Sequence, residues 1–463
     1  YNVVGGVVAM FSFITGTLGS ASQRFLAFDM AKGDRTRLRQ TFSLILLSYF
    51  ILISVTILLS EGIAVWFLNT HMTIPSERLY AANWVLQLSI LTLCFHILQA
   101  PYMSVIIAHE KMDVYAYASI LEVVMKLIIV YLLQLFAYDK LIVYACLISL
   151  NAFGIFLFYY VYCNKMFSES RYKYYYNGKD LKSLCSYAWW NVIGSIAIML
   201  RSQGINVLLN LFFNPVVNAA QGIAYQVNSA ITSFYTNFYT AVKPQIVKSY
   251  ASDENERMLS LICNSSRYAF FLVLVMIMPF MFYSKNILEI WLKTPPDMTN
   301  LFVKIVLVSA LIDTLSMPLV SGLQAANRIK EIQLTVSLIY LLNIPISYLF
   351  LSLGYPAVTP MYVNIVLIVI AFIPRIWIAH NILGLSVSYF TKDVLCRISI
   401  VSCISFLLCA ALYKYILPTE GLVVVLSIIV MFFITCLMVL MLGFTVEEIR
   451  CLFNKIKYKF NKN

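Results

Sequence analysis

One stretch of the chain, residues 217–242, carries polar side chains at the spacing of helix turns. Six of them recur at intervals of three or four residues: Gln221, Tyr225, Asn228, Thr232, Tyr235 and Tyr239. At about 100° per residue they fall within about 80° of one helix face, and Lys243 continues the line. This stripe has two interpretations, hydrogen bonding between helices or the wall of a polar cavity. The cavity is favoured, because the stripe runs the full length of the helix and its tyrosines offer a ligand both a flat ring and a hydroxyl.

A weaker polar stripe precedes it at residues 184–211. Its members fall within about 60° of one another: Asn191, Ser195, Ser202 and Asn206, with Arg201 at the edge. The matching helix near the start of the chain carries Ser12, Gly16, Gly19 and Gln23 on one face. Glycines there also allow close helix packing.

Two arginines inside apolar runs have no acidic residue three or four positions away, Arg201 and Arg375. A guanidinium binds phosphate oxygens in a fork and keeps its proton, so both suit an anionic headgroup. The alternative for each is an ion pair with an acidic residue of another helix. Arg24 and Arg267 also lack a local partner, but they lie nearer the helix ends, where we expect them to snorkel to the surface.

Two carboxylates within apolar runs are candidates for ion coupling. Glu122 and Lys126 stand four residues apart and can neutralise each other on one helix face. Asp313 has no local cation. It is either a site for H⁺ or Na⁺, since burial raises the pKa of a carboxylate, or half of a structural ion pair.

Membrane-spanning helices must position these side chains. Of the 463 residues, 61% are hydrophobic and 12% are charged, whereas soluble domains have about 25% charged residues. Runs long enough for a bilayer, about 20 residues each, follow one another almost end to end. We predict thirteen helical spans, at 3–28, 41–67, 81–107, 114–136, 141–163, 184–211, 217–242, 259–283, 301–326, 333–353, 361–383, 394–416 and 422–443. The fold class is therefore all-α, a polytopic membrane protein.

The net charge of +12 does not indicate nucleic-acid binding, because Lys and Arg gather in alternate loops. This bias places those loops and the C-terminus in the cytoplasm. The ten cysteines lie mostly inside apolar runs without a CxxC pair, which indicates buried thiols rather than disulfides or a metal site. The tyrosines at 174–176, with Lys173 and Lys179 nearby, are typical of an interfacial anchor on membrane lipids.

Two segments of the chain repeat in the same orientation. Gln23-Arg24-Phe25 and Gln99-Ala100-Pro101-Tyr102 are echoed by Pro244-Gln245-Ile246 and Ser316-Met317-Pro318-Leu319. A parallel repeat indicates two bundles, or lobes, related by an axis along the membrane normal. The second copy begins one helix earlier, so we expect the first lobe to lack its N-terminal helix in this sequence. The predicted parts are a first lobe at 1–163, a cytoplasmic linker at 164–183, a second lobe of six spans at 184–383, a terminal helix pair at 394–443 and a basic cytoplasmic tail at 444–463.

Several short segments carry a family resemblance: Tyr1-Asn2-Val3-Val4-Gly5-Gly6, Gln23-Arg24-Phe25, Asn206-Val207-Leu208-Leu209-Asn210 with Pro215, Asn218-Ala219-Ala220, and Ala241-Val242-Lys243-Pro244-Gln245-Ile246. They resemble the polysaccharide-transporter branch of the multidrug/oligosaccharidyl-lipid/polysaccharide exporter (MOP) superfamily, the O-antigen and capsule flippases of bacteria. The resemblance covers essentially the whole chain.

The resemblance implies a V-shaped pair of six-helix lobes around a hydrophilic cavity. It implies alternating access that carries polyprenyl-pyrophosphate-linked oligosaccharide from the cytoplasmic to the outer leaflet of the bacterial inner membrane. The family lacks a universal catalytic motif, and we expect no catalytic residue, no cofactor and no metal. H⁺ or Na⁺ is the candidate coupling ion, and polysaccharide assembly enzymes are candidate partners. The candidate substrate-binding residues are then the basic Arg201, Arg375, Arg24 and Lys243, the stripe at 217–242, Asn191 and Asn206.

Two other functions compete with the flippase. A multidrug antiporter of the same superfamily would expel cations, and its cavity should be rich in carboxylates, whereas the orphan charges here are mainly cationic. A membrane-embedded polymerase or glycosyltransferase should carry a long outer loop with catalytic residues. The longest outer loop here, about 284–300, has only Glu289 and Asp297 as acidic residues, and the parallel repeat favours a transporter.

Overall fold

The computed structural model describes residues 12–64, 76–134, 139–416 and 423–445, together with 448 and 450. Within these ranges the chain is helical and contains no strand. The longer helices are α2 (Ser12–Ala31), α3 (Arg35–Leu59), α5 (Ser76–Ala108), α6 (Met112–Leu132), α7 (Lys140–Met166), α8 (Gly178–Phe212), α9 (Pro215–Ala251), α10 (Asn255–Leu292), α11 (Thr299–Asp313), α12 (Ser316–Ala325), α13 (Ile329–Leu341), α14 (Asn343–Ser352), α15 (Thr359–Leu383), α17 (Arg397–Tyr415) and α18 (Val423–Met438). Shorter turns of helix lie at Ser60–Ala64, Ser168–Ser170, Val387–Tyr389 (α16), Phe390–Cys396 and Val439–Gly443.

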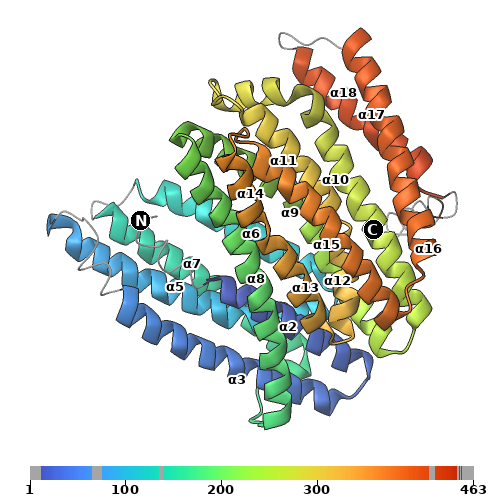
Figure 1. Cartoon of the computed structure of the whole chain (residues 1–463). Coiled ribbons are helices and arrows are strands. Elements are labelled where there is room, and N and C mark those ends of the chain that lie inside the picture. Colours follow the sequence, from blue (N-terminus) through green and yellow to red (C-terminus); the bar gives the residue numbers. More distant parts are fainter. Residues whose placement is uncertain are drawn as a thin grey trace. The chain divides into compact units, whose positions relative to one another are not determined.

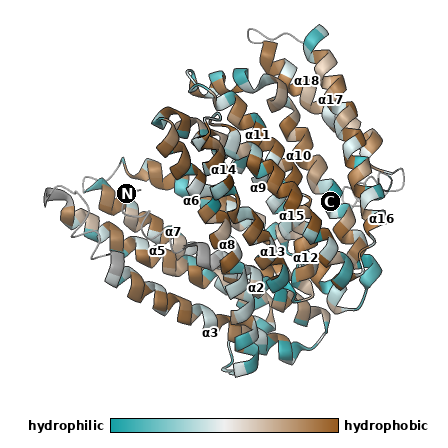
Figure 2. Ribbon diagram, viewed as in Figure 1, coloured by the Kyte–Doolittle hydropathy of each residue, from teal (hydrophilic) through white to brown (hydrophobic). Residues whose placement is uncertain are grey.

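Eleven helical segments of the described chain are long and apolar enough to cross a membrane. They coincide with eleven of the thirteen predicted spans and confirm the all-α, multi-pass prediction. Figure 2 shows them as hydrophobic ribbons with hydrophilic residues mainly at their ends. The other two predicted spans are also helical, as α2 and α9, but they are more polar. Residues 3–11 of the first span lie outside the described residues.

The chain divides into two compact units, and the described residues up to Ser195, with Val247–Glu254, form the first. Within it, α5 packs against α2, α3, α6 and α7. An ion pair joins the last turn of α9 (Pro215–Ala251) to the turn that follows α5, because Lys248 Nζ lies 2.6 Å from Glu110 Oε1. The predicted division into lobes at 163 and 184 stays a prediction.

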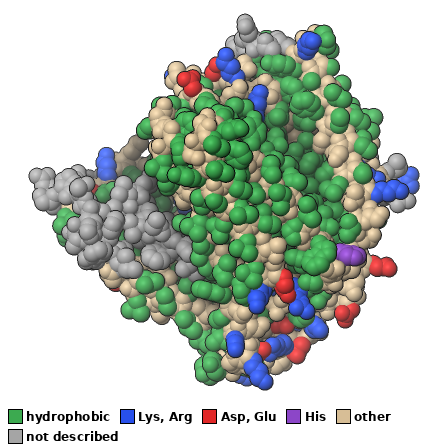
Figure 3. Space-filling view, viewed as in Figure 1, with side chains coloured by type: hydrophobic (Ala, Val, Ile, Leu, Met, Phe, Trp, Pro, Cys, Tyr) green, Lys and Arg blue, Asp and Glu red, His purple; other side chains and the backbone are tan. Residues whose placement is uncertain are grey.

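The second unit contains Ile196–Ile246 and the described residues from Asn255 onward. Here α15 packs against α11, α12, α13 and α14, and α10 packs against α11, α12, α17 and α18 (Figure 1). On the face shown in Figure 3, hydrophobic side chains cover most of these helices, and Lys, Arg, Asp and Glu gather toward the helix ends. That distribution fits helices whose sides contact hydrocarbon.

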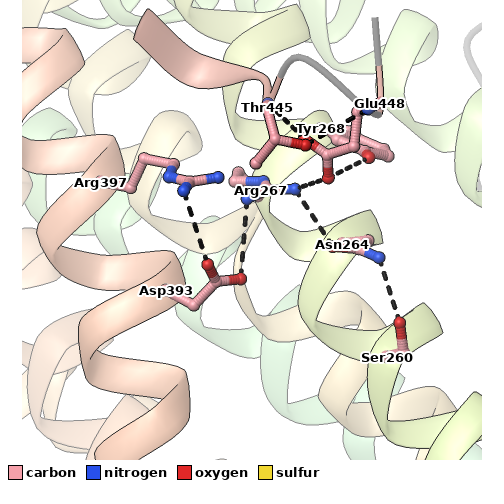
Figure 4. Close-up of polar contacts among 8 residues, drawn as sticks. All are labelled: Ser260, Asn264, Arg267, Tyr268, Asp393, Arg397, Thr445 and Glu448. Carbon is pink, nitrogen blue, oxygen red and sulfur yellow. Dashed lines mark hydrogen bonds and ion pairs between the residues drawn. The ribbon is translucent and has the colours of Figure 1, made fainter. Parts of the chain in front are cut away.

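The terminal pair, α17 and α18, is tied to α10 by a buried arginine (Figure 4). Arg267 of α10 is 1% exposed. One terminal nitrogen lies 3.6 Å from Asp393, which precedes α17, and the other bonds Glu448, which follows α18. Tyr268 donates to the same Glu448 carboxylate at 2.8 Å. The predicted snorkelling of Arg267 is therefore wrong, because partners from distant parts of the sequence allow it to stay buried.

The cysteines are free thiols within the described residues. Cys94, Cys163, Cys263 and Cys409 are buried as expected. The predicted burial is wrong for four exposed cysteines, Cys146, Cys185, Cys396 and Cys403, while Cys436 is half-buried. A thiol behaves as a small hydrophobic group, so exposure on an apolar helix surface has little cost.

Candidate functional site

Two of the predicted charged residues meet in the second unit. Arg375 of α15 is 6% exposed, and its Nη1 lies 3.7 Å from Oδ1 of Asp313 at the end of α11. The same nitrogen donates to Ser316 Oγ at 2.6 Å. The structural alternative for Arg375, an ion pair with Asp313, is thus present, although 3.7 Å exceeds the roughly 2.7–2.9 Å of a direct charge-assisted hydrogen bond.

Tyr340 of α13 brings the third charged residue, Arg201, into this group. The guanidinium carbon of Arg201 lies 4.2 Å from the centroid of the Tyr340 ring, within the range of a cation–π interaction. The hydroxyl of Tyr340 accepts from Arg375 Nη2 at 2.9 Å and donates to Asp313 Oδ1 at 3.4 Å. We call Arg201, Asp313, Ser316, Tyr340 and Arg375 the Tyr340 cluster.

Breaks in the helices place these side chains. Proline lacks the amide hydrogen that would bond the carbonyl four residues back. Pro318 follows the break between α11 and α12, and Pro345 follows the break between α13 and α14. Pro374 lies inside α15, one residue before the arginine of the cluster. Asp313 and Tyr340 therefore lie at or near helix ends, where side chains of successive segments converge.

A close approach of helices sets the position of Arg201. Gly204 lies one turn further along α8, and a Cβ atom there would be only 2.6 Å from Cδ1 of Ile344. Ile344 itself lies one turn beyond Tyr340. Glycine thus lets α8 come close to the break between α13 and α14, which brings Arg201 over the tyrosine ring.

The Tyr340 cluster holds two guanidinium groups and one carboxylate, a formal charge of +1. Donors remain in it, because Arg201 Nη1 and Arg375 Nε are buried and make no hydrogen bond within the described residues. The Asp313 side chain is 40% exposed, so the cluster is accessible at that side. Such an arrangement can bind an oxyanion through forked N–H groups, with a carboxylate beside it.

The stripe of α9 faces the interior of the second unit. Gln221, Tyr235 and Lys243 are buried; Tyr225, Asn228, Thr232 and Tyr239 are half-buried. Tyr235 packs in a hydrophobic core with residues of α8, α10, α11 and α15, and the Tyr239 hydroxyl bonds Ser321 of α12. The contacts that the structure gives these two tyrosines are with neighbouring helices, and the role of the stripe in a cavity stays a prediction.

A second polar face of α9 is exposed, and the sequence analysis missed it. It contains Gln226, Ser229, Ser233 and Asn237. These residues recur at spacings of three and four, about 120° around the helix from the first stripe. A polar face toward hydrocarbon is costly, so this face favours contact with water. The spacing of these four residues was visible in the sequence, but helical spacing alone does not determine which of two polar faces is buried.

The other predicted site residues are divided between the units. Asn206 is half-buried in the second unit. In the first unit, Asn191 is buried and its amide bonds the Tyr187 carbonyl at 3.3 Å. Arg24 is also buried there, with its guanidinium carbon 4.6 Å from the centroid of the Phe25 ring. The predicted snorkelling of Arg24 is therefore wrong, because aromatic rings cover it.

Glu122 also belongs to the first unit. Its carboxylate lies 2.6 Å from Lys126 Nζ on α6, as the spacing of four predicts, and the lysine side chain is 48% exposed. The carboxylate of Glu122 and the ammonium group of Lys126 lie on the same helix. Its geometry indicates local neutralisation, and a coupling role for Glu122 stays a prediction.

No family model and no curated protein matches this sequence. Solved structures do. A MATE family multidrug-resistance transporter of the MOP superfamily, in an outward-facing conformation, has a TM-score of 0.69 at 14% identity, over 83% of this chain and 88% of that chain. The Vibrio cholerae MATE transporter VcmN in its bent form has a TM-score of 0.65 at 16% identity, over 82% and 87%.

A MOP superfamily transporter from Pyrococcus furiosus is similar to the same extent, with a TM-score of 0.67 at 14% identity, over 84% of this chain and 88% of that chain. Its binding pocket is described as having reverse polarity that suggests a different function. At these identities the likenesses concern the fold. The expected all-α, multi-pass fold is thereby confirmed: the fold of this chain is like that of MATE transporters.

Proposed function

We propose that this chain is a membrane transporter that moves polyprenyl-pyrophosphate-linked oligosaccharide from the cytoplasmic to the outer leaflet of the bacterial inner membrane. The observation that carries the proposal is the Tyr340 cluster, in which two guanidinium groups outnumber one carboxylate. A pyrophosphate has at least two negative charges, and arginine binds its oxygens in a fork without losing a proton. In this proposal Arg201 and Arg375 bind the pyrophosphate.

The sugars would follow the polar surface of α9. Gln226, Ser229, Ser233 and Asn237 are exposed on one face, and half-buried Tyr225 and Tyr239 lie on the other stripe. Hydroxyl and amide groups bond sugar hydroxyls, and the tyrosine rings offer flat apolar faces. Arg24, Lys243, Asn191 and Asn206 are secondary candidates for substrate binding in this proposal.

A cation antiporter is the second candidate function. Asp313 favours it, because its side chain is 40% exposed and is not in direct hydrogen-bond contact with Arg375. Such a carboxylate can take H⁺ or Na⁺, and the solved transporters of this fold include one for multidrug resistance. The charge of the cluster argues against a cationic substrate. The reverse polarity of the Pyrococcus furiosus pocket indicates that this fold accommodates pockets of different charge.

The proposed orientation places the C-terminus in the cytoplasm, with H⁺ or Na⁺ as the coupling ion and polysaccharide assembly enzymes as partners. In a background without native cysteines, a cysteine at Ser76 should react with an impermeant thiol reagent in intact cells, and one at Lys179 should not. Labelling of Lys179→Cys from outside contradicts this orientation.

Transport in liposomes tests the function. The purified chain is reconstituted with a fluorescent polyprenyl-pyrophosphate oligosaccharide, and membrane crossing is read from quenching by external dithionite. We expect crossing with the wild type, strong loss with Arg201→Ala, and no loss with Arg328→Ala, which removes an exposed arginine at a helix start. Accumulation of a cationic dye driven by a pH gradient, with no lipid crossing, would instead establish the antiporter.

A further inference from the structure

A basic hollow of about 370 Å³ lies at the start of α3 in the first unit. Its charged lining is Arg35, Arg39 and Lys173, with one carboxylate, Glu169. That carboxylate is already bound, because Nε2 of His109 lies 2.5 Å from its Oε1. Glu169 keeps its negative charge, but the three cations outnumber it, so the lining has a formal charge of +2 and the hollow suits an anion.

The cations of the hollow are positioned through polar backbone contacts. Arg39 Nε donates to the carbonyl of Arg171 at 3.1 Å, which leaves its terminal nitrogens to grip an oxyanion. The Lys173 amide donates to Ser43 Oγ at 3.3 Å, which ties that residue to α3. Arg37 differs from them, because Asp180 binds it through two hydrogen bonds of 2.8 and 2.9 Å. Arg37 therefore stabilises the fold through Asp180, while Arg35, Arg39 and Lys173 are available to bind a ligand.

The segment 171–177 that crosses the start of α3 is extended and carries exposed tyrosines at alternate positions. Tyr172 is 51% exposed, Tyr174 75% and Tyr176 60%. Tyrosine is enriched where a membrane meets water, because its ring prefers the apolar side and its hydroxyl the polar side. Helix α3 begins at Arg35, a few residues before the apolar run predicted to span the membrane at 41–67, so we expect the hollow to lie at the level of lipid headgroups.

We propose that this hollow binds the phosphate-bearing headgroup of an anionic phospholipid. Arg35, Arg39 and Lys173 contact the phosphate oxygens, and the exposed tyrosines place the segment 171–177 in the interface. The basic side chains should favour an anionic lipid over a zwitterionic one, because each cation at a membrane surface increases the affinity for anionic lipid about fivefold. The site lies in a different unit from the Tyr340 cluster, and the proposal does not depend on what is transported.

The test is lipid binding to the full chain in non-ionic detergent, counted by native mass spectrometry. The probes are phosphatidylglycerol, phosphatidylcholine and inorganic phosphate. We expect phosphatidylglycerol to bind, phosphatidylcholine not to displace it, and millimolar inorganic phosphate to displace little. Displacement by phosphate as effective as by lipid would overturn the lipid headgroup as the ligand and indicate a free phosphate compound.

Matched variants decide whether the hollow is the site. Arg35→Gln/Arg39→Gln/Lys173→Gln should weaken phosphatidylglycerol binding about ten- to a hundredfold. The control removes the same charge from the surface outside the hollow, at Lys32, Lys179 and Lys182, and should change binding less than about threefold. Arg35 is exposed, so Arg35→Gln alone should leave folding intact and should weaken phosphatidylglycerol binding about fivefold. Equal weakening by both triple variants, or none by Arg35→Gln in a folded protein, would overturn the site.

Discussion

The guanidinium carbon of Arg201 lies 4.2 Å from the centroid of the Tyr340 ring. The hydroxyl of the same tyrosine is within hydrogen-bond distance of Arg375 and Asp313. One side chain thus contacts three charges from α8, α11 and α15. In the proposed function, an anion bound at Arg201 would change the electrostatic field at Asp313, a physical route by which substrate and coupling ion would affect each other.

Two substitutions of Tyr340 distinguish the contribution of its ring from that of its hydroxyl. Tyr340→Phe keeps the face that Arg201 covers and removes the hydroxyl that Arg375 binds, a contact worth about 1.5–3 kcal/mol. We expect lipid-linked oligosaccharide transport to fall about tenfold or more, and to fall further in Tyr340→Leu, which also loses the cation–π interaction. Tyr362→Phe, at an exposed tyrosine of α15, is the control and should transport normally. Normal transport by Tyr340→Phe contradicts the role of the hydroxyl.

The ion pair between Asp313 and Arg375 predicts which arginine variant a neutral residue at position 313 can rescue. Arg375→Gln leaves the carboxylate without its cation, and since Asp313 is 40% exposed we expect a loss of stability of only about 1–2 kcal/mol. Addition of Asp313→Asn should restore the melting temperature of Arg375→Gln, because it removes the unpaired charge. The same change should not restore transport in Arg201→Gln. Rescue of Arg201→Gln instead would make Arg201 half of an ion pair with Asp313.

The sequence predicted the charged members of the Tyr340 cluster and missed Tyr340 itself. Arg201, Arg375 and Asp313 stand out because a charge in an apolar run is costly wherever the helix packs. Tyr340 gives no such signal, since a tyrosine in an apolar helix is ordinary. Its hydrogen-bond partners Asp313 and Arg375 lie 27 and 35 positions away. Arg201 is farther still along the chain, so only tertiary packing brings these residues together.

Two other differences between the sequence-based predictions and the structure arise from the rotation of α9 about its axis and from partners that are distant in the sequence. Both faces of α9 are polar at helical spacing, and the choice between them depends on the neighbours that cover Tyr235. The sequence predicts that Arg267 snorkels, because it lies near a helix end and no acidic residue lies three or four positions away. Its partner Glu448 lies 181 positions away, beyond what local spacing can reveal.

The exposed polar face of α9 predicts contact with water. In a background without native cysteines, cysteines at Ser229, Ser233 and Asn237 should react with a charged thiol reagent in membranes. A cysteine at Leu349, which is 56% exposed on an apolar helix, should react slowly, because hydrocarbon covers that position. Equal labelling of all four positions, or none on α9, contradicts a water-facing surface there.

Arg267 should control how firmly α17 and α18 stay on α10. Arg267→Met leaves Asp393 and Glu448 without their shared cation, and removal of one partner of a buried pair costs about 3–5 kcal/mol. We expect faster hydrogen exchange in residues 387–416 and 423–443 and a lower melting temperature. Arg397→Met is the matched control, because Arg397 makes a longer contact of 3.8 Å with Asp393 and should have a small effect. Unchanged exchange in Arg267→Met would show that apolar packing alone holds the pair.

The same contact predicts acid sensitivity at Glu448, which lies beyond the last span. Burial opposes its ionisation, but the Thr445 amide, the Tyr268 hydroxyl and the Arg267 charge outweigh burial, so the pKa of Glu448 lies below its usual value. A carboxylate with a lowered pKa contributes stability above its unfolded pKa, about 4.3, and loses it as the pH falls through the folded value. Exchange protection in 423–443 should therefore be constant from about pH 7 to 5 and fall below about pH 4. Glu448→Gln should flatten this fall, since glutamine keeps an oxygen acceptor and does not titrate. An equal fall in wild type and Glu448→Gln would assign the acid sensitivity to another group.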